Sequence, residues 1–214
     1  MSQDQTSLFK EGSNPLLPRD GVADYIPALF SRNESDDLFK ELLATTPWQN
    51  DEVMLFGKRR VLSRKVAWMG DESFSYSYSG TSKTASPWTQ SLLVIKERVE
   101  QQCAHRFNSC LLNLYHDGTE GMGWHSDDEK TLGRNPLIAS VSFGAQRVFK
   151  FKHRESKEVV SVLLENGSLL VMKGETQHHW VHTMPKTKKI TTPRINLTFR
   201  FFGGSTAIQS INHP

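Results

Sequence analysis

The chain has 214 residues, of which 37% are apolar, and its 26 basic and 23 acidic side chains give a formal net charge of +3. This length fits one domain, its 2 cysteines are too few for a disulfide scaffold, and no stretch reaches the about 20 apolar residues of a membrane span. The N-terminus lacks the charged start and apolar centre of a signal peptide, so we expect a cytoplasmic protein, or a nuclear one in a eukaryotic cell, without membrane contact.

The first half of the chain is predicted to hold a tail and two helices. Residues 1–20 are polar and rich in Gly and Pro, which indicates a flexible tail. Leucines recur at helical spacing over residues 34–43, and Pro47 marks the end of this first helix. A second helix is expected to begin at Ser86 as N-cap, with Pro87 at its first position. Its apolar face carries Trp88, Leu92, Ile95, Val99 and Cys103.

The stretch between these helices, residues 53–80, combines basic and aromatic residues. Its alternating run FSYSYSG predicts a hairpin or a covering flap. Charge is also uneven along the chain, because residues 1–53 sum to −6 and residues 54–214 to +9, which makes the second part a plausible polyanion-binding body. A basic cluster by itself is more often a solvated surface than a nucleic-acid site. The clustered cations are Lys58, Arg59, Arg60, Arg64 and Lys65, and further along Lys186, Lys188 and Lys189.

Short β-rich runs dominate the chain after residue 111. They predict a sandwich, a jelly roll or a barrel, with the two helices packed on its outside. We therefore divide the chain into a tail (1–20), an N-terminal region with the helices and the flap (21–110) and a β-rich core (111–214). The runs are LLNLY, LIASVSF, RVFKF, VVSVLL, SLLVM and INLTFRFF.

A histidine and an aspartate two residues apart predict a metal site. His125 and Asp127 would point to the same side of an extended segment, and the later histidines His178, His179 and His182 are candidates for a third ligand. Two imidazoles and one carboxylate on one face form the facial triad of non-haem Fe(II) oxygenases, whereas zinc is more usually held tetrahedrally by three protein ligands and a water. The His-x-Asp pair alone is a weak signal, so its weight depends on the residues around it.

Polar and apolar residues alternate over residues 194–200, so a strand would place all the polar ones on one inward face. Two guanidiniums inside a barrel need an anion, and a dicarboxylate suits them because the planar fork of Arg binds carboxylate bidentately. Asn113 and Tyr115 likewise share a strand face and offer an amide and a phenol to the same ligand. The inward face carries Arg194, Asn196, Thr198 and Arg200, and the outward face Ile195, Leu197 and Phe199.

Together these residues resemble the AlkB family of Fe(II) and 2-oxoglutarate dependent dioxygenases. The resemblance covers about residues 53–202 and is carried by NLY, WHSDDE, IASVSFGA, HWVHTMP and RINLTFR. It implies an α+β fold, a double-stranded β-helix (jelly roll) with N-terminal helices packed outside and a nucleotide-recognition flap. It also implies Fe(II), 2-oxoglutarate and O2 as cofactor and co-substrates. Fe(II) would be bound by His125, Asp127 and His182, and 2-oxoglutarate by Arg194, Asn113, Tyr115, Asn196, Thr198 and Arg200.

The resemblance further implies oxidative removal of methyl groups from damaged DNA bases such as 1-methyladenine and 3-methylcytosine, with release of formaldehyde and succinate. A flipped base would stack on Tyr78 near Tyr76, and Glu129, rather than Asp128, would accept from its exocyclic amine. Phe56 would be a wedge that fills the gap in a duplex, with Arg64 among the nearby cations. Ser63 stands where duplex-preferring relatives commonly have a proline, and WHSDDE is as much like the single-strand-preferring ones, so the strand preference stays open.

Two other functions compete with DNA repair. The same chemistry would act on methylated RNA, because the iron and co-substrate motifs do not sense the 2′-hydroxyl. A catalytically silent jelly roll that binds nucleic acid through its basic cluster is the third reading, although a pure binder has no need for inward metal ligands and buried cations. We expect a monomer, because no exposed apolar stripe is evident.

Overall fold

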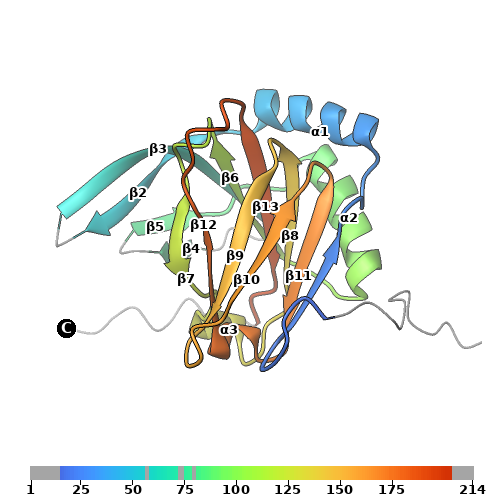
Figure 1. Cartoon of the computed structure of the whole chain (residues 1–214). Helices are drawn as coiled ribbons and strands as arrows, with labels where there is room; N and C mark the ends of the chain where they lie inside the picture. Colours follow the sequence, from blue (N-terminus) through green and yellow to red (C-terminus); the bar gives the residue numbers. More distant parts are fainter. Residues whose placement is uncertain (1–14, 56–57, 72–74, 79–80, 204–214) are drawn as a thin grey trace, which may run out of the picture.

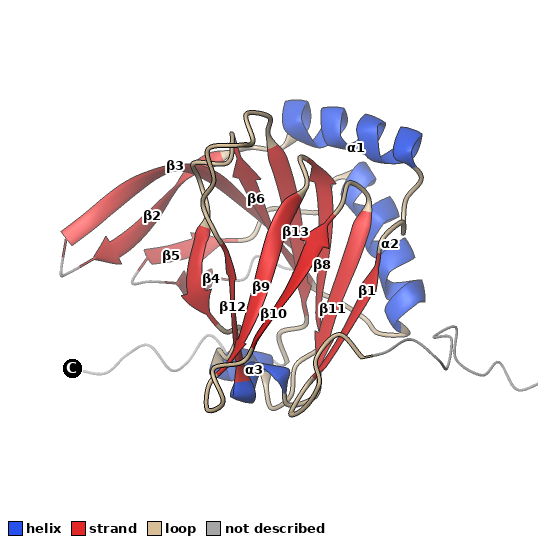
Figure 2. Ribbon diagram, in the orientation of Figure 1, coloured by secondary structure: helices blue, strands red, loops and turns tan. Residues whose placement is uncertain are grey.

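The computed structural model describes residues 15–55, 58–71, 75–78 and 81–203, and covers the backbone alone at 53–55, 75–78 and 81–84. Two antiparallel sheets face each other, with helices on the outside (Figures 1 and 2). The large sheet has the strand order β1 (Val22–Ile26), β11 (Ser168–Lys173), β8 (Ile138–Gly144), β13 (Arg194–Arg200), β6 (Ser109–Tyr115), β3 (Lys58–Gly70) and β2 (Gln49–Leu55). The small sheet has the order β10 (Val159–Leu164), β9 (Arg147–His153), β12 (Trp180–Met184) and β7 (Met122–His125). This arrangement confirms the predicted jelly roll.

The two faces of the large sheet have different surroundings because side chains alternate along each strand. The outward face packs under the helices, where Leu112 of β6, Val141 of β8 and Leu197 of β13 are all fully buried in one apolar cluster. The inward face looks toward the small sheet, and a second apolar cluster that includes Phe151 and Trp180 fills one end of the space between the sheets. The alternation predicted for residues 194–200 is therefore confirmed.

The helices are α1 (Arg32–Thr45) and α2 (Gln90–Cys103), which cover the large sheet (Figure 2), and the short α3 (Thr176–His179) and 3-10 turn η1 (Lys130–Leu132). α1 begins with a capping box, in which Ser31 accepts from the backbone N–H of Glu34 and the Glu34 carboxylate accepts from the backbone of Ser31. The helix ends just before Pro47, as predicted.

α2 begins three residues later than predicted. Thr89, and not Ser86, is its N-cap and accepts from the backbone N–H of Leu92. Ser86 is held instead by the large sheet, because its N–H donates to the carbonyl of Trp68 and its own carbonyl accepts from Gly70. Because Ser86 pairs with β3, the helix begins later than the local sequence predicts.

Two hairpins precede the predicted core. β2 and β3 form a ribbon that extends beyond the body of the protein, and the backbones of β4 (Ser75–Tyr78) and β5 (Thr81–Thr84) pair as a second hairpin on the same side (Figure 1). β3 continues into the large sheet and pairs with β6. Of the predicted tail, residues 1–14 lie outside the described part of the chain, and Leu17 is buried against the second apolar cluster. Within the described residues, no helix has the length and hydropathy needed to cross a membrane.

Candidate active site

A cavity of about 150 Å³ lies between the two sheets. The inward side chains of β3, β6 and β13 form one wall, and side chains of β7, β9 and β12 form the other. The cavity is lined by every residue that the resemblance implies as a metal or co-substrate ligand, namely His125, Asp127, His182, Asn113, Tyr115, Arg194, Asn196, Thr198 and Arg200.

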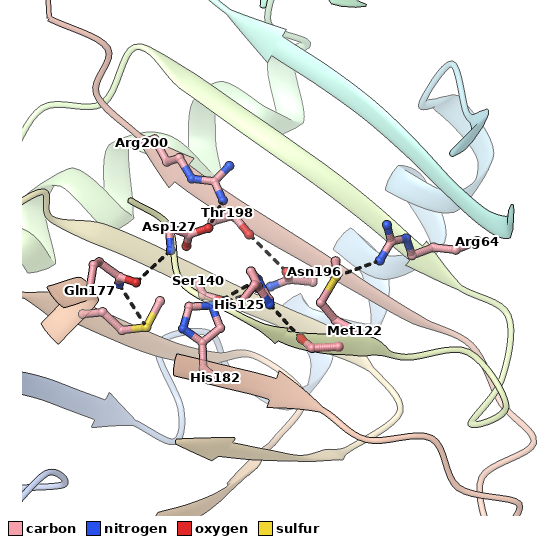
Figure 3. Close-up of polar contacts among 12 residues, drawn as sticks. Arg64, Met122, His125, Asp127, Ser140, Gln177, His182, Asn196, Thr198 and Arg200 are labelled. Carbon is pink, nitrogen blue, oxygen red and sulfur yellow. Dashed lines mark hydrogen bonds and ion pairs between the residues drawn. The ribbon is translucent and has the colours of Figure 1, made fainter. Parts of the chain in front are cut away.

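The predicted metal ligands converge at the small sheet. β7 and β12 are neighbours, and their register sets His125 opposite His182. Asp127 follows β7 directly, and one potential ligand atom from each of the three residues lies within 4.8 Å of the others (Figure 3). His178 and His179 do not join them, because His178 contacts the side chain of Asn135 at 2.9 Å and His179 lies beside Glu175. The structure thus selects His182 among the three candidate histidines.

Hydrogen bonding and burial prepare the two imidazoles for a metal. Nδ1 of His125 donates to the carbonyl of Gly123 at 2.9 Å, which leaves Nε2 facing His182. Burial lowers the pKa of His182 to about 3, so its imidazole is neutral at pH 7. The Nε2 atoms of the two rings are only 3.2 Å apart. Two nitrogens bound to one metal at about 2.1 Å and at right angles lie about 3 Å apart, so the geometry fits a shared cation.

Asp127 is held as an anion. Burial alone would raise its pKa, but the guanidinium of Arg200 and the nearby histidines bring the net pKa below its usual value. Arg200 donates from Nη2 to Oδ1 of Asp127 at 2.6 Å (Figure 3), so the other carboxylate oxygen is the one available to a metal. Two imidazoles and a carboxylate with further positions open are the donor set of non-haem Fe(II) sites.

The co-substrate side of the cavity is built by β13 and its neighbours. Arg194 is 3% exposed and donates to Oγ of Ser142 at 2.9 Å, with its guanidinium over the ring of Tyr115. Burial lowers the pKa of Arg194 to about 10. Within the described part of the chain no carboxylate pairs with this cation, and its Nε has no hydrogen-bond partner. A buried guanidinium without an anion fits the distal carboxylate of 2-oxoglutarate.

Hydrogen bonds fix the remaining polar side chains of this wall. The amide of Asn196 donates to Oγ of Ser140 at 2.7 Å and its oxygen accepts from Thr198 at 3.1 Å. Asn113 is paired in register with Asn196 and is 3% exposed. The prediction that an outside anion neutralises both arginines needs a correction, because Asp127 already supplies the anion for Arg200.

Arg64 also lies in this cavity and not on the surface with the other cations of its cluster. It is 6% exposed, pairs with the carboxylate of Asp51, and contacts both Sδ of Met122 and the ring of Tyr115. Lys58 and Arg60, by contrast, are exposed on the ribbon. The sequence interpretation that groups Arg64 with exposed backbone-binding cations is therefore corrected: its side chain faces inward from β3, two strands from Arg194.

We expect Asp51→Ala to destabilise the protein strongly. Removing one partner of a buried ion pair leaves the other charge uncompensated, which costs about 3–5 kcal/mol. Urea denaturation would measure the loss in the free energy of unfolding. The double variant Asp51→Ala/Arg64→Met should recover much of that stability; an unfolding midpoint as low as that of Asp51→Ala alone would contradict the pairing.

The two acidic residues that follow the metal ligands lie in different surroundings. Glu129 lines the cavity, whereas Asp128 is exposed and lies 3.9 Å from Arg154. The base-stacking candidates Tyr76 and Tyr78 belong to β4, but their side chains fall outside the description, and Phe56 lies outside the described residues.

Several buried polar residues of the site were missed from the sequence. Ser140 and Ser142 carry a signal, because they alternate with apolar residues along β8 as the partners on β13 do. Arg147 is 1% exposed and donates to the carbonyls of Glu120 and Pro185, which joins the loop before β7 to the loop after β12. Asp51, Met122 and Gln177 carry no sequence pattern that distinguishes them.

Comparisons with known proteins agree with this geometry. A family model described as 2OG-Fe(II) oxygenase superfamily matches residues 23–200. The chain is 38% identical over 195 residues to the DNA oxidative demethylase ALKBH2 of Mus musculus, covering 86% of this chain and 82% of that protein. It is also 38% identical over 184 residues to the alpha-ketoglutarate-dependent dioxygenase alkB homolog 3 of Bos taurus, covering 81% of this chain and 64% of that protein. A solved structure described as that of OsALKBH1 shares the fold, with a TM-score of 0.58, 16% identity and coverage of 83% of this chain and 97% of that one.

The matched family model spans both sheets and every metal ligand, and the relatives match over most of the chain. The resemblance read from the sequence is thereby confirmed. The chain belongs to the AlkB family of 2-oxoglutarate and Fe(II) dependent dioxygenases.

Proposed function

We propose that this enzyme repairs DNA by oxidatively demethylating N-alkylated bases of the 1-methyladenine and 3-methylcytosine type. The observation that carries the proposal is the juxtaposition, in one cavity, of the His125–Asp127–His182 group with the unpaired buried cation Arg194. The names of the ALKBH2 and alkB homolog 3 relatives support DNA as the substrate.

Different residues of the cavity would bind the metal, the co-substrate and the base. His125, Asp127 and His182 would hold Fe(II), which with 2-oxoglutarate and O2 supplies the oxidation of the methyl carbon. Arg194 would fix the distal carboxylate of 2-oxoglutarate, and Arg200 would hold Asp127 in its ionised form. Glu129 lines the same cavity and would accept from the exocyclic amine of a flipped, positively charged base, which is reachable only outside the stack.

The β2–β3 ribbon supplies the features expected of a DNA contact. Its exposed residues Lys58 and Arg60 lie on the ribbon that extends beyond the body of the protein (Figure 1). Cations in such a position would bind DNA phosphates independently of the base sequence. The enzyme would act as a monomer, which sedimentation velocity tests directly: a dimer at micromolar concentration contradicts this part of the proposal.

The decisive test loads the protein with Fe(II) and 2-oxoglutarate under anaerobic conditions and then admits air. Methylated duplex DNA, single-stranded DNA and RNA are offered in parallel, and mass spectrometry follows the modified nucleosides together with succinate and formaldehyde. We expect stoichiometric loss of the methyl group from DNA. Turnover confined to RNA would make the enzyme an RNA demethylase, and binding to all three without consumption of 2-oxoglutarate would favour the silent binding module.

Phe56→Ala is expected to reduce activity on duplex DNA more than on single-stranded DNA. An apolar wedge offsets the unstacking cost of a few kcal/mol only where a stacked duplex must be opened. The ratio of kcat/KM on the two substrates measures the effect, with Leu55→Ala as the neighbouring control. An equal loss of kcat/KM on both substrates would contradict the assignment of Phe56 as a wedge.

A further inference from the structure

Gln177 connects the short helix α3 to the metal-binding segment. Its side chain is 1% exposed, and its Oε1 accepts from the backbone N–H of Asp127 at 2.9 Å (Figure 3). Its Nε2 lies 3.6 Å from Sδ of Met172 on β11, which fixes the other end of the amide. The amide therefore spans the distance between the sheet that carries Met172 and the loop that carries Asp127.

The segment that Gln177 contacts is irregular, and side chains rather than a sheet hold the backbone and carboxylate of Asp127. Residues 126–129 lie between β7 and η1 and form no strand or helix, so sheet hydrogen bonds do not fix the backbone of Asp127. Two contacts position this residue instead: Gln177 at the backbone and Arg200 at the carboxylate, the latter at 2.6 Å. Ser126, one residue earlier, accepts from Arg154 at 2.7 Å.

α3 is a firm support for such a contact. The hydroxyl of Thr176 donates to the carbonyl of Lys173 at 2.6 Å, and the backbone N–H of Val22 on β1 donates to the same hydroxyl at 2.9 Å. α3 also leads directly into β12, which carries His182. A single stretch of chain, residues 176–182, thus supplies one metal ligand and sets the backbone of another.

A buried amide at this position is costly unless its hydrogen bonds are made. Apolar packing against Met172 would be satisfied as well by a leucine or a methionine, so packing does not account for the amide. Among the residues that the structure describes, the strong hydrogen bond of this side chain is to Asp127. Residues that orient metal ligands typically raise the affinity for the metal by roughly 10- to 100-fold.

We propose that Gln177 is a positioning residue of the metal centre, which sets the carboxylate of Asp127 at the distance from His125 and His182 that Fe(II) requires. The proposal rests on the ligand assignment used in the proposed function. It does not depend on which nucleic acid is the substrate, because metal binding is measured without one.

The test uses the full chain and Mn(II), an oxidation-resistant substitute for Fe(II), with free Mn(II) followed by electron paramagnetic resonance. Gln177→Met keeps the length and apolar contact of the side chain and removes the acceptor. We expect it to weaken Mn(II) binding by roughly 10- to 100-fold, to speed hydrogen exchange at the Asp127 amide, and to leave the melting temperature without metal within about 4 °C of the wild type.

Two further variants separate positioning from general damage. Met172→Leu disturbs the packing at the same amide without touching the bond to Asp127, so its Mn(II) affinity should equal that of the wild type. Gln177→Glu keeps an oxygen at the acceptor position, and burial favours the neutral carboxylic acid there, so the variant should retain both the affinity and the slow exchange, which provides the measurement if Gln177→Met does not fold. Wild-type affinity in Gln177→Met, an equal loss in Met172→Leu, or a loss in Gln177→Glu would each overturn the proposal.

Discussion

Asp127→Ala is expected to abolish metal-dependent turnover while leaving the affinity for DNA largely unchanged. The variant keeps both imidazoles but removes the only carboxylate of the group. Charge stabilisation by a bound metal contributes several kcal/mol to a reaction barrier, so its loss lowers the rate by roughly 10³-fold or more. Consumption of 2-oxoglutarate and loss of methyl groups would be measured by mass spectrometry, and DNA affinity by fluorescence anisotropy.

The same substitution has a second effect that the structure makes specific. Asp127 forms an ion pair with Arg200, whose side chain is 13% exposed, so Asp127→Ala removes the carboxylate of a nearly buried ion pair. The expected cost is about 3–5 kcal/mol of unfolding free energy. Asp127→Asn is the matched control: its amide oxygen still accepts from Arg200, so it should lose less stability than Asp127→Ala, although it no longer supplies the negative charge.

The two variants therefore separate folding from chemistry. Both should lack turnover, since a neutral amide is a poor ligand for Fe(II), but Asp127→Ala should unfold at a lower urea concentration than Asp127→Asn. Normal demethylation by Asp127→Asn would remove the metal assignment, and normal stability of Asp127→Ala would contradict the ion pair with Arg200.

The alternation of residue types allowed much of this site to be predicted from the sequence. Along β13, four polar side chains alternate with three fully buried apolar ones, and a strand between two layers has no other way to arrange them. The pairing of Asn196 with Asn113 then follows from the antiparallel register. Such an alternation can be read from the sequence because burial determines which face of the sheet each side chain of the strand occupies.

Other features depend on contacts between distant segments and carry no such pattern. β7 and β12 are four and five residues long, and their pairing is interrupted by a register shift, so neither shows a clear alternation. The sequence spacing alone allows His178 or His179 as well as His182 to be the third ligand. The competition is decided because residues 176–179 form a helix, which turns His178 toward Asn135. Arg64 is grouped with the backbone-binding cations because it lies in the same basic run of the sequence, whereas the partner that buries it, Asp51, is thirteen residues away.

Arg194→Met is expected to raise the KM for 2-oxoglutarate greatly. Truncating one member of a buried, hydrogen-bonded charge pair costs about 2–5 kcal/mol, which corresponds to a weakening of roughly 30-fold to several thousand-fold. Steady-state kinetics at saturating DNA and metal would measure it. Ser142→Ala is the matched control: it removes the hydroxyl that accepts from Arg194 at 2.9 Å but leaves the guanidinium in place, so its KM should rise far less.

Thermal unfolding tests the role of Arg194 independently, because Arg194→Met should weaken 2-oxoglutarate binding without lowering the melting temperature. Without co-substrate, Arg194 holds an uncompensated charge in a site where burial lowers its pKa to about 10. Replacing it by an apolar side chain of similar length should therefore leave the melting temperature unchanged or raise it. Ligand binding stabilises the folded state by mass action, so 2-oxoglutarate should raise the melting temperature of the wild type and have almost no effect on Arg194→Met. A variant that is both less stable and still stabilised by 2-oxoglutarate would show that Arg194 is a structural residue and that the dicarboxylate binds elsewhere.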